Sequence, residues 1–406
     1  MRWIFENNHY PKNLLELYEK ELCVSPAIAQ LLAAHEFQDL KQAQKFLNPR
    51  LADIETPSLI ENLDLAAKTI QTAFETSKRI AVVSDYDVDG ITSLALLSRF
   101  CEALGYHFQP FFPNREQEGY GLSTKIVQRV LDTGKYDLLI ALDCGTNSND
   151  AIEQLFAQNM QIVVIDHHQH NCETLPKAIL VNPHVHPQKN PISSQQLCTV
   201  GLVFKVLHAW LKKLKQAGLD LPIKLSQYLD LVALGTIADL VPLQNENRIF
   251  VSYGLKQLKK TNNPGLKSLL EVAEIDTQEV IAVDDISFRI APRINVSGRL
   301  SSADLPFKLL LHPRIEDCRI WAKELNYLNI ERQKIEKQIT RQADNMIQAK
   351  PSSLAYVLYH SDWHAGVVGI VAGKLSRKYY RPVFVLGKQN DICKGSGSGI
   401  PEINLV

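Results

Sequence analysis

The sequence predicts an α/β protein in which a parallel-sheet domain is joined by a long helix to a smaller, incomplete α/β domain. Three observations predict this fold. Apolar strand-type runs alternate with helical stretches between residues 79 and 166, a charge-rich stretch at 314–349 has neither Pro nor Gly, and a strand, turn, helix and strand follow from residue 354. At 406 residues with 45% hydrophobic content, the chain is too long for one ordinary core.

The first domain begins with three apolar runs of the buried-strand type. RIAVVS at 79–84 precedes an aspartate-rich turn and a helical stretch at 91–104. DLLIALD at 137–143 precedes a polar turn and a helix near 149–159, and QIVVID follows at 161–166. Strands and helices that alternate in this way are typical of a parallel sheet covered on both faces.

The rest of the chain is mainly helical until the second domain. An apolar helix is expected over 226–241, further helices to about 274, and strands at 354–359 and 382–386 on either side of a Gly-rich turn and a helix. We therefore divide the chain into four parts. These are an N-terminal helical segment (1–45), a catalytic domain with a helical insert (46–313), a connecting helix (314–350) and a partial second domain (351–406).

Composition restricts the possible function only mildly. The 44 basic and 44 acidic residues balance, which is mild evidence against a nucleic-acid ligand, although phosphate binding depends on local rather than global charge. Seven cysteines without a C-x-x-C pair suit reduced structural thiols better than disulfides or a zinc ribbon. The chain begins without a basic region followed by an apolar run, and no apolar stretch approaches ~18 residues. We expect a cytoplasmic protein that does not bind a membrane.

Acidic side chains and histidines follow all three predicted strands. Asp85, Asp87 and Asp89 alternate directly after the first strand, and taken alone they suit an exposed acidic turn or a helix cap equally well. Asp143 ends the second strand. The third runs into Asp166, His167 and His168, and Asp239 follows an apolar helix. The carboxyl ends of parallel strands share one crevice, so these groups are expected to converge.

Carboxylates with one or two imidazoles are the ligands expected for Mn²⁺ or Mg²⁺. A pair of such ions suits hydrolysis by in-line phosphoryl displacement, with Asp143 as the candidate bridging ligand. His167 is expected to bind metal through one ring nitrogen. For His168 two roles stay open, because it could polarise the phosphate or protonate the leaving group, or only hold a neighbouring ligand by a hydrogen bond.

Six motifs in order resemble the DHH phosphoesterases and, within them, the RecJ exonuclease family. They are SDYDVDGITS, PNREQEGYGLS, LLIALDCGT, VIDHHQ followed by VNPH, LDLVALGTIADLVPLQNENR, and FRIAPRINVSGRL. The resemblance covers roughly residues 45–405. It implies a metal-dependent exonuclease that degrades single-stranded DNA in the 5′→3′ direction, with roles in DNA repair and recombination.

The resemblance also implies roles for individual residues. Phosphate contacts are implied for Arg115, Arg293 and Arg299, whose fixed fork of donors suits a phosphate, although salt bridges to nearby acids are an alternative. Tyr120 is either a platform for a splayed base or a packed core residue. The implied metal ligands are Asp87, Asp89, Asp143, His167 and Asp239, with Asp85 and His168 among them or directly beside them.

The second domain resembles the DHHA1 domain. Its KGSGSGI segment is expected to be a Gly-Ser loop in which Lys394 and Ser396 grip the DNA strand. Ser398 and Gly399 stand where the family pattern has Arg-Ser, so one phosphate-binding charge is lost. RecJ proteins continue into an OB-type module, and we therefore expect a fragment, a truncated product or a degenerate copy with weaker DNA binding.

Two other readings use the same residues. A DHH hydrolase of very short oligonucleotides, cyclic dinucleotides or pyrophosphate would keep the metal site but prefer dimers or trimers over longer strands. An inactive scaffold would keep the fold for partner binding and would bind no Mn²⁺. Protein partners are not predicted by these residues.

Overall fold

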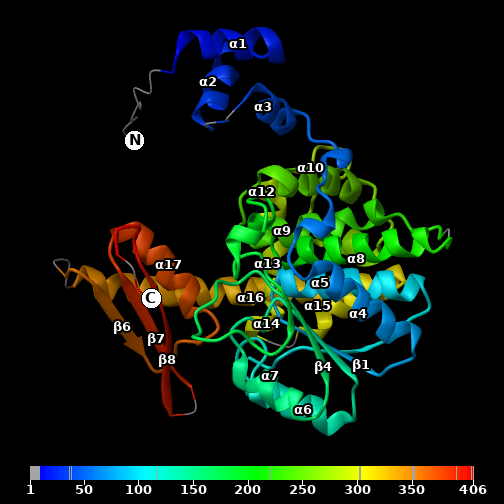
Figure 1. The fold of residues 1–406 in the computed structure, drawn as a ribbon. Helices are drawn as coiled ribbons and strands as arrows, with labels where there is room; N and C mark the ends of the chain where they lie inside the picture. The colour runs from blue at the N-terminus through cyan, green and yellow to red at the C-terminus, as the bar shows by residue number, and fades with distance from the viewer. Residues whose placement is uncertain are drawn as a thin grey trace.

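The computed structural model describes residues 10–35, 37, 39–115, 117–219, 221–300, 303–349, 353–389, 391–403 and 405. Figure 1 shows three bodies along the chain. A small group of N-terminal helices lies at one end, a large α/β body forms the middle, and a smaller domain is attached through the long helix α16.

The central sheet has five parallel strands in the order β2-β1-β3-β4-β5, which confirms the predicted fold class. The three predicted strands lie within one residue of their expected bounds. The two outer strands were not predicted, because each has only three residues and β2 is partly exposed and contains Pro110. The strands are β1 Ile80–Ser84, β2 Gln109–Phe111, β3 Leu138–Leu142, β4 Gln161–Ile165 and β5 Ile179–Val181.

Helices cover both faces of this sheet. Val82 and Ile140 face the larger core, which the sheet shares with α4 Leu63–Glu75, α5 Val88–Ala103 and α8 Thr199–Gln216. Their neighbours Val83 and Ala141 point the opposite way, toward α6 Thr124–Thr133 and α7 Asn149–Phe156. Because both faces are buried, the strands are continuous apolar runs rather than alternating ones.

The helical insert extends the larger core. The predicted helix over 226–241 is a short 3-10 turn, Leu225–Tyr228, followed by α9 Leu229–Ala238, so Asp239 caps the end of the helix. After it come α10 Asn245–Lys259 and α11 Pro264–Val272. The segment from Val283 to Leu311 is a series of short helices: α12 Val283–Asp285, a π-helical turn Ile286–Ile290, α13 Ala291–Asn295, α14 Ser297–Leu300 and α15 Asp304–Leu311.

The long helix α16 spans Ile315–Gln348 and leads to the second sheet. The expected boundary at 350/351 lies outside the described residues. In this sheet β6 Tyr356–His360 pairs parallel with β7 Val383–Gln389, and β7 pairs antiparallel with β8 Ile392–Ser398. Helix α17 Val368–Tyr379 packs on one face and shares a core with the end of α16.

The prediction of a Gly-Ser loop is wrong, since residues 394–398 belong to strand β8. The glycines serve close packing instead of a loop. A Cβ on Gly395 would lie 2.7 Å from Leu386 Cγ, and one on Gly397 would lie 2.6 Å from the Phe384 ring. Glycine therefore lets β8 lie against large side chains of β7.

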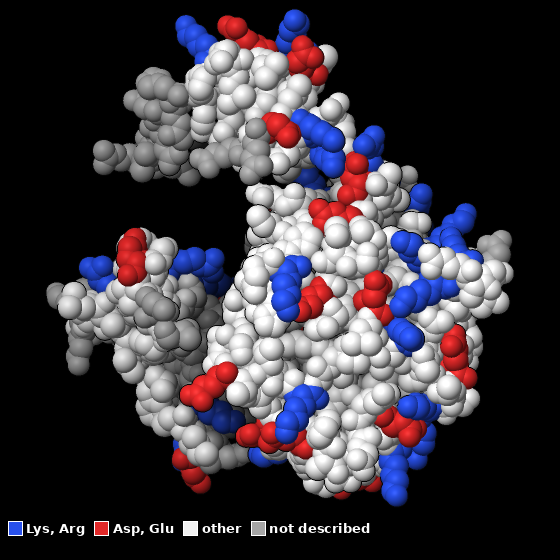
Figure 2. All heavy atoms as spheres, in the orientation of Figure 1, with Lys and Arg blue, Asp and Glu red and all other residues white. Residues whose placement is uncertain are grey.

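The N-terminal helices α1 Lys12–Leu22, α2 Pro26–Ala34 and α3 Leu40–Leu47 have a small core of their own. They contact the body where the Arg248 guanidinium lies 3.6 Å from the centre of the Phe46 ring. Basic and acidic side chains are interspersed over the face seen in Figure 2. Among the described helices, none has both the length and the apolar character required to span a bilayer.

Candidate metal centre

Strands β1, β3 and β4 deliver acidic residues to one edge of the sheet. Asp85, Asp143 and Asp166 follow directly after these strands, and each is at most 1% exposed. Asp143 adopts a left-handed backbone conformation with φ 60°, and its N–H donates to the carbonyl of Ile165 at 3.0 Å. This turn leads the chain away from the sheet and leaves the carboxylate at the strand end, where the sequence predicts it.

The first turn of α5 supplies two further carboxylates. Asp87 is the N-cap, and its Oδ1 accepts the N–H of Gly90 at 3.1 Å, so the helix begins three residues earlier than predicted. Asp89 is 1% exposed and accepts the backbone N–H of Thr199 at 2.7 Å and of Val200 at 2.8 Å. These amides open α8, so the Asp89 carboxylate also meets the positive end of that helix.

Helix α9 brings Asp239 to the same place from the insert. Its close approach to α5 depends on Gly235, where a Cβ would lie 2.5 Å from Thr92 Oγ1 and 3.1 Å from Asp89 Oδ1. A larger side chain would push the two helices apart. The glycine one turn before Asp239 therefore allows the two carboxylates to meet.

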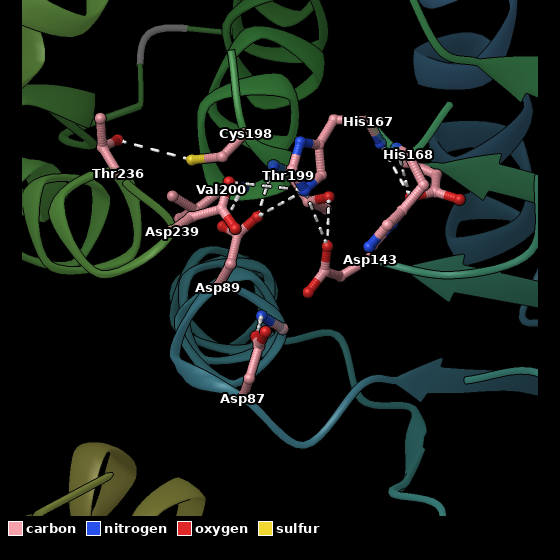
Figure 3. A network of polar contacts seen from close by, with 12 residues as sticks. Asp87, Asp89, Asp143, His167, His168, Cys198, Thr199, Val200, Thr236 and Asp239 are labelled. Carbon is pink, nitrogen blue, oxygen red and sulfur yellow. Dashed lines mark hydrogen bonds and ion pairs between the residues drawn. The ribbon is translucent and has the colours of Figure 1, made fainter. Parts of the chain in front are cut away.

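His167 Nε2 lies at the centre of the acidic group. It is 3.4 Å from Asp143 Oδ1, 3.5 Å from Asp239 Oδ2 and 3.8 Å from Asp89 Oδ2 (Figure 3). These distances exceed normal hydrogen bonds. They match the spacing of ligands around a shared ion, since donors that each lie about 2.1 Å from a metal are separated by about 3–4 Å.

Several carboxylate oxygens at the site accept no hydrogen bond of normal geometry from any described residue. They are both oxygens of Asp85, Oδ2 of Asp143 and Oδ2 of Asp239. Burial, followed by the charge of Asp87, raises the pKa of Asp85 to about 8, and burial, followed by the charge of Asp89, raises the pKa of Asp239 to about 8. Buried acceptors without partners among mutually repelling acids fit a site for divalent cations.

Asp166 organises the two histidines rather than facing the other acids. Its Oδ1 accepts the N–H of His167 at 2.8 Å and the Nδ1 side of His168 at 2.7 Å, while its Oδ2 accepts the N–H of Thr146 at 3.0 Å. Burial alone would raise the pKa of Asp166, but the hydrogen bond and charge of His168 and the contacts with Thr146 lower it overall. The hydrogen bond that His168 donates to Asp166 in turn raises the pKa of His168 to about 9.

Tyr120 borders the centre on the solvent side. Its hydroxyl lies 3.2 Å from His168 Nε2, and its ring meets the edge of Tyr86 at a centroid distance of 5.9 Å. At 53% exposure Tyr120 is not a packed core residue, so that interpretation is wrong. The ring is available to a ligand beside His168.

The first turn of α8 contains site residues that the sequence did not reveal. Thr199 Oγ1 donates to Asp143 Oδ1 at 3.0 Å. The buried Cys198 places its sulfur beside Asp89 and Asp239, with potential ligand atoms within 4.8 Å of one another. In the sequence these residues belong to the uncharged apolar run CTVGLVF at 198–204, and nothing in that segment signals a site.

The expected phosphate-binding arginines have different surroundings. Arg299 Nη1 donates to the carbonyl of Gly366 at 3.1 Å and so links the first domain to the second, and burial lowers its pKa. Arg115 is exposed, with its guanidinium 5.9 Å from the centre of the Tyr86 ring. Arg293 differs, because its three nitrogens donate to Asn326 and to the carbonyls of Arg289 and Val272. Its donors are committed to helix packing.

The second-domain residues Lys394 and Ser396 lie on β8. Their side chains share one face of the strand, because they are two residues apart. That face lies toward α17, since Ser396 packs beside Gly369 of α17, where a Cβ would lie 3.2 Å from Ser396 Oγ. Ser396 pairs with Val385 of β7. Their backbone N–H groups are not presented by a loop.

Comparison with known proteins gives the family. A match to the DHH family, N-terminal domain, covers residues 79–236. The single-stranded-DNA-specific exonuclease RecJ of Dickeya dadantii is 34% identical over 395 residues, which cover 94% of this chain and 67% of that protein. This chain belongs to the RecJ family. The RecJ of Bacillus subtilis is 32% identical over 408 residues, covering 100% of this chain and 50% of the relative.

The fold agrees with a solved RecJ structure. The crystal structure of RecJ from Thermus thermophilus in complex with Mn²⁺ matches with a TM-score of 0.82 and 30% identity, over 97% of this chain and 55% of that chain. The chain therefore spans about half the length of the Bacillus and Thermus RecJ proteins.

Proposed function

We propose that this chain is a metal-dependent 5′→3′ exonuclease that hydrolyses the phosphodiester bonds of single-stranded DNA. The observation that supports it most is the convergence of Asp89, Asp143 and Asp239 on His167 Nε2 within 3.8 Å, in a chain of the RecJ family. Hydrolysis of a phosphodiester requires charge neutralisation at the phosphate, and this cluster is built to hold cations.

The proposed cofactors are two Mn²⁺ or Mg²⁺ ions. The donor set is carboxylate and imidazole, which suits these ions, and the Thermus RecJ was crystallised with Mn²⁺. Bound ions would supply Lewis-acid stabilisation of the charge that develops on the phosphate. The residues proposed to hold them are Asp85, Asp87, Asp89, Asp143, His167 and Asp239, with Asp143 shared between the two positions.

His168 is the proposed catalytic group beside the metals. Asp166 binds its Nδ1 side at 2.7 Å, which leaves Nε2 directed toward Tyr120 and the open side of the site. From Nε2 the ring can donate a hydrogen bond to a phosphate oxygen or pass a proton to the leaving group. Asp166 keeps the ring in that orientation, as carboxylates do for catalytic histidines.

The DNA strand is proposed to lie between the two domains. Arg299 bridges them through Gly366, and Arg115 and Tyr120 are exposed on the same border of the metal centre. Arg115 and Arg299 supply charge for the phosphates, Tyr120 supplies a stacking surface, and Lys394 and Ser396 contact the strand from β8. We leave out Arg293, because its nitrogens already bind protein oxygens.

Hydrolysis of end-labelled DNA tests the proposal. With Mn²⁺, the chain should release mononucleotides from 5′-labelled single strands and leave blunt duplex DNA intact. Asp143→Ala should abolish release, while Asp150→Ala, an exposed acid on α7, should not. Release from the 3′ end, or preference for dinucleotides over 20-mers, would support a different DHH hydrolase. A folded protein that binds Mn²⁺ but cleaves neither would contradict the exonuclease proposal.

A further inference from the structure

A buried thiol lies at the edge of the metal centre. Cys198 is the N-cap of α8 and is 0% exposed. It directly precedes Thr199, whose N–H is bound by Asp89, so the thiol is held beside that carboxylate by the backbone. Its sulfur and one oxygen each of Asp89 and Asp239 all lie within 4.8 Å of one another.

The spacing suits a shared ion. In a tetrahedral site, where zinc binds thiolate sulfur at about 2.3 Å and carboxylate oxygen at about 2.0–2.2 Å, the sulfur and an oxygen lie about 3.6 Å apart. The ligand atoms of Cys198, Asp89 and Asp239 all lie within 4.8 Å of one another, so rotation of the Cys198 side chain can bring the sulfur to the spacing of a shared ion. The thiol donates to Thr236 Oγ1 at 3.6 Å, a weak hydrogen bond that rotation toward the two carboxylates would give up (Figure 3).

The surroundings independently favour a cation here. Asp143 is 1% exposed, and its Oδ2 accepts no hydrogen bond from the described residues. Oδ2 of Asp239 also lacks a hydrogen bond, and His167 Nε2 lies 3.5 Å from it. The sulfur is therefore not an isolated cysteine but a fourth donor group beside two carboxylates and an imidazole.

We propose that Cys198 is a soft ligand of this centre, through which it binds a thiophilic divalent ion such as Zn²⁺ or Co²⁺ between Asp89 and Asp239. The inference rests on the proposed function, since it concerns the same centre. When the sulfur binds, the S–H bond breaks, its proton passes to solvent and the thiolate becomes the ligand. Carboxylate and imidazole alone suit Mn²⁺ or Mg²⁺, whereas an added thiolate favours zinc and cobalt.

Cobalt spectroscopy of the whole chain tests the proposal directly. Co²⁺ added to the metal-free protein should produce a near-ultraviolet thiolate-to-cobalt charge-transfer band that saturates with binding. The band should be absent in Cys198→Ser and Cys198→Ala. It should persist in Cys101→Ser, a control for a thiol equally buried on α5. In competition with Mn²⁺, both Cys198 variants should bind Zn²⁺ at least about tenfold more weakly.

The outcomes separate this inference from the proposed function. Cobalt that binds without the band, or a band that remains in both Cys198 variants, would overturn the role of Cys198 and leave the exonuclease proposal intact. Failure to bind Co²⁺ or Mn²⁺ at all would overturn the metal centre itself.

Mn²⁺-induced thermal stabilisation of the Cys198 variants shows whether they fold. If neither variant is stabilised, cobalt binding by the wild-type chain and by Cys101→Ser decides: a charge-transfer band of equal strength is expected in both, and bound Co²⁺ without the band in either would overturn the proposal.

Discussion

The carboxylate of Asp89 binds the backbone N–H of Thr199 at 2.7 Å, which joins two helix N-termini in one contact. Asp89 lies in the first turn of α5 and Thr199 opens α8, so the contact fixes the angle at which both helices approach the sheet. Thr199 passes the connection on, since its hydroxyl donates to Asp143 at the end of β3. Three segments that are distant in the chain are thus aligned by the residues proposed to hold metal.

Neutralising Asp239 should separate metal binding from folding. Burial raises the pKa of Asp239 to about 8. Between about pH 4 and 8 the carboxyl group therefore keeps its proton in the folded protein, whereas it has lost the proton in the unfolded chain. The free energy of unfolding consequently falls as pH rises across that window. Asp239→Asn should therefore make the metal-free protein more stable at pH 8. It should also remove the stabilisation by Mn²⁺, which is about 2.7 kcal/mol at a hundred times Kd. Thermal unfolding with and without Mn²⁺ measures both, and lower metal-free stability of the variant would contradict the argument.

In the metal-free protein the His168 ring should stay protonated well above neutral pH. The hydrogen bond to Asp166 raises the pKa of His168 to about 9. The stabilisation of the folded protein by the protonated His168 ring is therefore complete below about pH 6.5 and is lost as pH rises through about 9. NMR titration of the ring protons should show this, and Asp166→Asn should move the midpoint down toward about 6.5. An unchanged midpoint in Asp166→Asn would show that the pair does not control the ring.

Arg299 should affect DNA binding more than the chemical step. Its guanidinium is partly buried and donates to Gly366 O across the two domains, a geometry that a lysine cannot reproduce. Arg299→Lys should raise KM for single-stranded DNA roughly 10- to 100-fold, because this is the effect of losing one charged hydrogen bond. The change in kcat should be smaller. Arg314→Lys, at the exposed arginine that is the N-cap of α16, is the matched control. Equal losses in kcat and kcat/KM for Arg299→Lys would indicate a role in the transition state instead.

A buried ion pair should stabilise the link to the N-terminal helices. Lys205 Nζ lies 2.6 Å from Glu246 Oε1 and 2.5 Å from the carbonyl of Glu55, with both side chains at most 3% exposed. Lys205→Met should lower the free energy of unfolding by about 3–5 kcal/mol, because it leaves the Glu246 charge buried without its partner. The double variant with Glu246→Gln should lose less than the sum of the single changes. Strict additivity in urea denaturation would show that the pair is not coupled.

The three inner strands of the central sheet could be located from the sequence because they are buried on both faces. Continuous apolar runs at β1, β3 and β4 need no tertiary information to be recognised. The strand β8 was mistaken for a loop, because its glycines suggest a flexible segment. Glycine is needed there because Phe384 and Leu386 on β7 are bulky, and β7 lies outside the segment itself.

The sequence by itself determined which strands end in acids and histidines, and therefore at which edge of the sheet the site lies, because parallel strands all present their carboxyl ends there. Only the tertiary structure decided which of these groups meet. Asp89 and Thr199 are 110 positions apart, and no local pattern indicates their contact. Likewise, Asp166 faces its own histidines rather than the other acids, and Cys198 lies beside Asp239. The contacts of Asp89 and Cys198 depend on how helices α8 and α9 pack against α5, which is set by side-chain fit across the core.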